Sequence, residues 1–147
     1  MKKTLLILAL AIGLLSFSQR GDMKNRIKAQ KVAFITEKLS LTSDEAQKFW
    51  PIYNAFDATT DNVRSNDLRG IKQALRKNPD MSDSDAEKLL NQLIAAEDKM
   101  HNAKVKLISD LKGVISAKKI IRLKRAEDEF NRELLKRLRE RHSKNRD

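Results

Sequence analysis

The stretch LSLTSDEAQKFWPIYNAF, residues 39–56, contains a strong signal for the start of a helix. Thr42 and Glu45 have the spacing of a capping box, in which each side chain accepts a hydrogen bond from the other residue's backbone amide. Pro51 follows and predicts a kink, because its ring clashes with the carbonyl group one turn earlier. Within eight positions lie four of the seven aromatic residues of the chain, Phe49, Trp50, Tyr53 and Phe56.

The aromatic residues allow two interpretations, a packing cluster or a binding patch. Phe49 and Phe56 lie on the apolar face of the expected helix and should pack inward. Trp50 and Tyr53 lie to one side of that face. They could equally belong to the core or contact a partner or a second copy of the chain, because indole and phenol rings suit half-buried contacts.

Outside this stretch, the composition predicts an all-α fold. Glycine and proline are scarce, Leu, Ala, Lys, Glu and Arg dominate, and alternating β-branched runs are absent. Apolar residues spaced by threes and fours predict four helices over about residues 24–39, 43–77, 83–112 and 117–142. Two start signals compete for the third helix, a capping box from Ser84 to Glu87 and a cap at Ser82. The fourth follows a Ser116 cap, with Lys119 three positions on as a weak echo of the second helix start.

The expected helices are long for the size of the chain. A helix of about 35 residues spans roughly 50 Å, so the fold should be an elongated four-helix hairpin. A small domain leaves part of such long apolar stripes uncovered, and a second copy would bury them. The sequence therefore predicts a homodimer.

The first 18 residues, MKKTLLILALAIGLLSFS, have the order of a signal peptide. Lys2 and Lys3 precede an apolar segment over residues 4–15. Ser16, Phe17 and Ser18 then have the small-x-small pattern of a signal-peptidase cleavage site. The alternative is a membrane anchor, but a spanning helix needs about 20 apolar residues. Cleavage before Gln19 would leave a single helical domain over residues 19–147, with a short disordered basic tail, exported to the periplasm.

The net charge indicates the class of partner. The full chain carries a formal charge of +11, and loss of the two leader lysines leaves +9 on 129 residues. An exported chain meets little nucleic acid, so we expect no nucleic-acid partner but unfolded or acidic polypeptides, or an anionic membrane surface. Residues 117–142 hold ten basic and five acidic residues. The candidate attracting residues are Arg122, Arg125, Arg132 and Arg139, and the alternative is a solvated helix face.

Signals for catalysis or for metal binding are weak. The chain has no cysteine and two histidines, and no nucleophile triad, phosphate loop or zinc spacing is visible. Glu97, Met100 and His101 share one helical turn, but soft or borderline metals usually take more imidazole or sulfur ligands. We therefore expect neither an enzyme nor a bound metal or cofactor, with Met100 in the core.

The helix starts resemble the motif of the Spy/CpxP family of periplasmic LTxxQ-motif proteins, over about residues 24–142. The matching segments are Leu41-Thr42-Ser43-Asp44-Glu45 and Ile115-Ser116-Ala117-Lys118-Lys119. The segment AEDEFNRELLKRLRER, residues 126–141, is similar to the last helix of Bacteroidetes-type members. Glu45 and Lys119 stand where the motif has glutamine, and the His- and Cys-rich metal segments of zinc-associated relatives are missing.

The resemblance implies a curved four-helix chain that dimerises into a cradle. Its basic, partly apolar concave side would hold unfolded clients without ATP, as an envelope chaperone. The alternative that the resemblance implies is a periplasmic stress or metal sensor that regulates a membrane or sigma-factor signalling partner.

Overall fold

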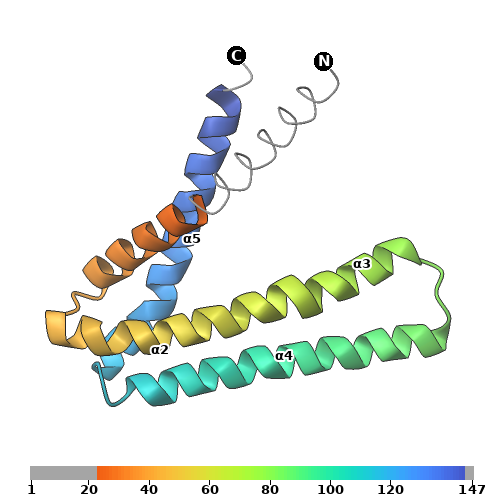
Figure 1. Ribbon diagram of the computed structural model, residues 1–147, viewed down its shortest axis with the longest axis horizontal. Coiled ribbons are helices and arrows are strands. Elements are labelled where there is room, and N and C mark those ends of the chain that lie inside the picture. The colour runs from red at the N-terminus through yellow and green to blue at the C-terminus, as the bar shows by residue number, and fades with distance from the viewer. Residues whose placement is uncertain (1–22, 145–147) are drawn as a thin grey trace, which may run out of the picture. The chain divides into compact units, whose positions relative to one another are not determined.

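The computed structural model describes residues 23–144, and within them the chain is all-helical, without a strand (Figure 1). This confirms the all-α class. Four helical segments begin and end within two residues of the predicted positions. They are a helix over 23–38, one continuous run made of α2, η1 and α3, the helix α4, and the helix α5. The bounds of the labelled elements are Ser43–Asn62 for α2, Val63–Leu68 for η1, Arg69–Lys77 for α3, Asp83–Leu111 for α4 and Ala117–Lys144 for α5.

Two of the expected terminal features lie wholly or partly outside the described residues. These are the signal peptide over residues 1–18, with its cleavage before Gln19, and the end of the basic tail, residues 145–147. The helix α5 continues to Lys144, so residues 143 and 144 of the expected disordered tail are helical. No helix within residues 23–144 is both long and apolar enough to cross a membrane.

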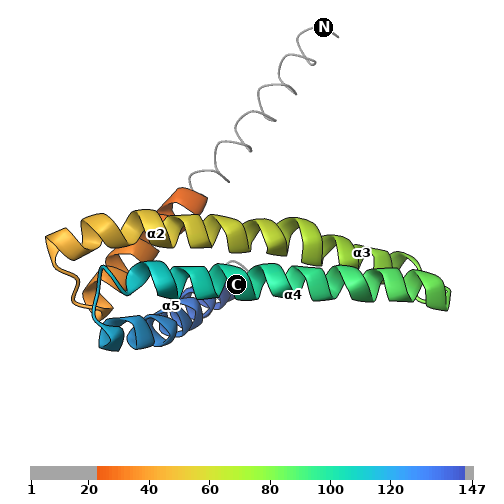
Figure 2. The same cartoon turned by 90° about the horizontal axis from the view of Figure 1, so that it is seen from below.

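The described chain divides into two compact units. One contains residues 41–121, and the other contains the helix over 23–38 together with α5 from residue 122 onward. In the first unit, α4 runs back alongside α2, η1 and α3, as both views show (Figures 1 and 2). Its buried apolar residues are Phe49, Tyr53, Val63, Ile71, Ala96, Leu107, Leu111 and Ile115.

The start of α4 settles the competition between its two cap signals. Ser82 is the N-cap, and its Oγ accepts a hydrogen bond from the Asp85 amide at 3.2 Å. The predicted capping box from Ser84 to Glu87 is therefore wrong. The Ser82 cap places Asp83 and Asp85 in the first turn, where carboxylates favour the positive end of the helix dipole. Lys88 and then Ser82 hold the pKa of Asp85 below its ordinary value.

The second predicted helix is not a regular α-helix over 43–77. It contains the six-residue π-helical segment η1. The buried Val63 and Ile71 are eight positions apart, so in a regular α-helix they would point about a quarter turn away from each other. Wider π turns hold more residues per turn, so η1 brings Ile71 back to the face of Val63. At Pro51, where the sequence predicts a kink, the helix α2 is not interrupted.

The second unit joins the helix over 23–38 to α5. The rings of Phe34 and Phe130 lie 5.7 Å apart, beside the buried Ile35 and Leu123. Lys38 Nζ lies 3.0 Å from a Glu129 carboxylate oxygen. Ser40, just after the first of these helices, has a φ of 46°, in the left-handed region that glycine adopts more easily.

Candidate functional site

The two motif-like helix starts lie together in the unit of residues 41–121. At the start of α2, the Glu45 amide donates to Thr42 Oγ1 at 3.3 Å, and the Thr42 amide donates to Glu45 Oε2 at 2.9 Å. The predicted capping box is thereby confirmed. At the start of α5, the Lys119 amide donates to Ser116 Oγ at 3.4 Å, so Ser116 also caps its helix.

A salt bridge joins the two helix starts directly. Lys119 Nζ lies 2.6 Å from Glu45 Oε2, and each side chain is only about one-fifth exposed, at 21% and 22%. Lys119, followed by the Thr42 amide, holds the pKa of Glu45 below its ordinary value of 4.5. Glu45 and Lys119 therefore pair with each other across 74 positions of sequence. Sequence reasoning found both caps but not this pairing.

The four aromatic residues form one continuous cluster around Tyr53. Its ring stacks on Phe49 at 5.5 Å, meets Trp50 edge-on at 5.5 Å and lies 6.0 Å from Phe56. Phe49 and Tyr53 are buried, with 0% and 1% exposed, whereas Trp50 and Phe56 are half-buried. Phe49 therefore packs inward as expected. The burial of Tyr53 favours the core over a partner contact in this structure.

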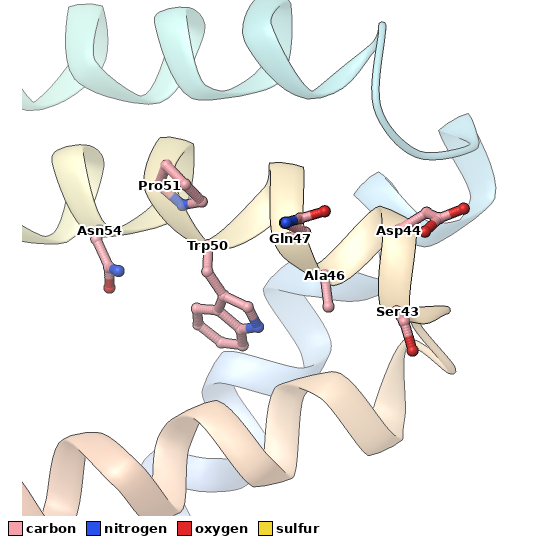
Figure 3. A pocket seen from close by; sticks show the side chains of 7 residues that line it. All are labelled: Ser43, Asp44, Ala46, Gln47, Trp50, Pro51 and Asn54. Carbon is pink, nitrogen blue, oxygen red and sulfur yellow. The ribbon is translucent and has the colours of Figure 1, made fainter.

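Trp50 lines a shallow open groove of about 640 Å³ along the first three turns of α2 (Figure 3). In Figure 3 its indole ring and the Asn54 side chain point to the same side of the helix. The other residues of the groove lining are Ser43, Asp44, Ala46, Gln47 and Pro51. Of the two candidate aromatic partner contacts, Trp50 is the one with accessible surface.

The candidate arginines lie on the exposed side of α5. Arg125 donates to Glu129 Oε1 at 2.8 Å, although its side chain is 83% exposed. Arg122, Arg132 and Arg139 are exposed and form no ion pair with a described side chain. We call these three residues and the exposed Lys136 the basic stripe, because at 3.6 residues per turn they occupy about a third of the helix circumference.

An apolar side chain adjoins the basic stripe. Leu135 is 54% exposed and lines a shallow groove of about 460 Å³ together with three residues of the stripe and one acid. These other lining residues are Arg132, Lys136, Arg139 and Glu140. A separate face of α5 is apolar and buried, through Leu123, Ala126 and Phe130. The groove therefore combines three cations with one accessible aliphatic side chain.

The third set of candidate residues lies on α4. Glu97 and His101 are exposed, and Met100 is half-buried. Among residues 23–144, no three His, Cys, Asp or Glu side chains lie close enough together to hold a metal ion.

The chain matches no protein-family model, no curated protein and no solved structure.

Proposed function

We propose that the protein is an exported, ATP-independent chaperone or envelope-stress protein of the periplasm that binds unfolded or acidic polypeptides. The proposal includes a homodimer, cradle-like as the family resemblance implies. The observation that carries it is the basic stripe of α5 with the exposed Leu135 beside it. The resemblance of the helix starts to LTxxQ-motif proteins supports the same reading.

The physical argument rests on how the two kinds of side chain act. Arg122, Arg132 and Arg139 form no ion pair with a described side chain. Such positive charges attract acidic chains from a distance and raise the rate of encounter. An exposed charge contributes little to affinity at contact, because water screens it. Leu135 offers a small apolar contact, so a client would be held loosely. Weak holding suits release without ATP.

The first test is suppression of aggregation. An acidic enzyme is denatured and diluted into buffer with the mature protein at near-stoichiometric ratio, and light scattering is followed at low and at high salt. We expect suppression by the wild type, and loss of most of it in the combined variant Arg122→Gln, Arg132→Gln, Arg139→Gln. Since salt screens the attraction, high salt should reduce the difference between the two proteins.

A matched variant controls for net charge. Lys72, Arg76 and Lys77 on α3 are exposed, and their combined change to Gln removes the same three charges elsewhere. This control should retain full suppression. Equal loss in both variants would show that net charge matters and the basic stripe does not, and no suppression by the wild type would refute the chaperone proposal.

Two further measurements separate the alternatives. A sensor that regulates one membrane or signalling partner would pull down a single protein and show no general anti-aggregation activity. Attachment to an anionic membrane would appear as co-flotation with anionic liposomes, which client binding does not require. Amino-terminal sequencing of secreted material tests export, with Gln19 expected as the first residue and Met1 contradicting cleavage.

A further inference from the structure

The helix α4 carries a second apolar face that nothing in its own unit covers. Four aliphatic side chains on it remain exposed although α4 packs along α2, η1 and α3. They are Leu90 at 55%, Ile94 at 49%, Val105 at 51% and Ile108 at 36% exposed, and we call them the outer stripe. At 100° per residue, these four positions fall within about 60° of one another around the helix. They therefore form one straight seam, separate from the buried face of Ala96, Leu107 and Leu111.

The outer stripe has a symmetric order along α4. Leu90 and Ile108 lie equally far from residue 99, on either side of it. Ile94 and Val105 lie symmetrically about a point half a residue further on. In two antiparallel helices, residues at equal distances from the crossing point face each other. A second α4 laid antiparallel, centred near residue 99, would therefore set Leu90 against Ile108 and Ile94 against Val105.

The polar residues along the seam follow the same symmetry. Glu97 and His101, both exposed, lie in the middle of the outer stripe and are symmetric about residue 99. Glu87 and Lys112, also exposed, are symmetric about nearly the same point at the two ends. Glu87 would thus face Lys112 of the second copy, and Glu97 would face His101, whose ring can donate a hydrogen bond to a carboxylate. Lys104 would lie within one turn of the opposing Glu97.

We infer that the outer stripe of α4 binds the same stripe of a second copy, antiparallel and two-fold symmetric, centred near residue 99. An isologous contact of this kind requires a self-complementary surface, and both the aliphatic and the charged positions of α4 meet that requirement. The Glu97–His101 pairs set the register, as polar residues within a helix seam do at some cost in stability. The inference rests on the proposed function only in its homodimer part, and it names the surface that forms the dimer.

Crosslinking tests orientation and register together. The chain has no cysteine, so single cysteines can be placed freely. A mixture of the Leu90→Cys and Ile108→Cys proteins, treated with a short thiol-to-thiol crosslinker, should give mainly the mixed dimer. Leu90→Cys alone should crosslink poorly, because the two copies of residue 90 would lie about 27 Å apart along the seam. Efficient crosslinking of Leu90→Cys to itself would overturn the antiparallel register.

Sedimentation equilibrium from low micromolar to millimolar protein measures the affinity. Ile94→Asp should weaken dimerisation at least tenfold, whereas Leu75→Asp, at a residue 50% exposed on α3, should leave it unchanged. Circular dichroism of both variants establishes that they fold. The inference is contradicted if the affinity of the dimer is unchanged by Ile94→Asp. It is also contradicted if Leu75→Asp lowers that affinity as much as Ile94→Asp does.

Charge exchange provides a test that does not depend on a core change. Glu97→Lys removes the acceptor that faces His101, and His101→Glu sets two carboxylates opposite each other, so each change should weaken the dimer. The double variant should restore it, because a lysine then faces a carboxylate. No restoration overturns the assigned register. A wild type that remains monomeric at every concentration refutes both the interface and the homodimer, while the aggregation assay still decides the chaperone proposal separately.

Discussion

Replacing Leu111 by alanine should strongly destabilise the unit of residues 41–121. Leu111 is the last residue of α4 and is 0% exposed. Removing a fully buried leucine side chain loses its transfer free energy and leaves a cavity, which together cost about 2–5 kcal/mol. A domain of this size has a free energy of unfolding of roughly 5–15 kcal/mol. The substitution should therefore remove a large fraction of the stability without abolishing the fold.

Urea denaturation measures the loss of free energy directly. The chain has a single tryptophan, Trp50, which lies in the same unit and reports its unfolding by fluorescence, with helix loss followed by circular dichroism. At a slope of about 2 kcal/mol per molar urea, the midpoint should fall by about 1–2.5 M. Coincidence of the two signals establishes that one transition is measured.

The same substitution at a half-exposed position is the control. Leu75→Ala, at a residue 50% exposed on α3, leaves no enclosed cavity and should change the free energy of unfolding by no more than about 0.5 kcal/mol. If Leu111→Ala and Leu75→Ala shifted the urea midpoint equally, the assignment of Leu111 to a packed core would be refuted.

Three further predictions concern helix ends and charge. Thr42→Ala removes the cap of α2 and should cost about 1 kcal/mol by urea denaturation, whereas Thr42→Ser should cost less. Ser40→Gly relieves a left-handed backbone and should raise the free energy of unfolding by up to about 1 kcal/mol; a loss would contradict strain there. Because the pKa of Glu45 is lowered, its contribution is complete above its ordinary value of 4.5 and is lost as the pH falls through the lower folded-state value. Glu45→Gln should therefore flatten the pH dependence of the melting temperature below about pH 4.5, and an unchanged profile would argue against the Lys119 salt bridge.

Local signals in the sequence were enough to place most of the helices. Thr42 and Ser116 could be identified as caps because a capping residue and its partner are three positions apart. At the start of α4, Ser82 and Ser84 both offered a hydroxyl with an acidic residue three positions on, so spacing alone could not choose between them. The segment η1 has no period of its own over six residues, and its wide turns became evident only from the backbone of the structure.

Contacts between distant segments could not be read from the sequence. Glu45 and Lys119 each looked like a departure from a glutamine motif, and nothing in the local pattern indicated that they form a salt bridge with each other. Tyr53 and Trp50 are three residues apart on the same side of α2, yet one is buried and the other half-buried. Helical periodicity gives the side of a helix on which a residue lies but not how closely the neighbouring helices approach it.

The π-helical turns of η1 give the chain a place where its length can change. Without one residue of η1, Val63 and Ile71 would be seven positions apart, which a regular α-helix places on one face. Losing a residue there lets the segment tighten, and everything beyond it keeps its orientation toward α4. The same loss elsewhere in α2 or α3 would rotate all later side chains by about 100° and turn the buried face toward water. Deletion of a single residue from this long helix should therefore be tolerated chiefly within residues 63–68.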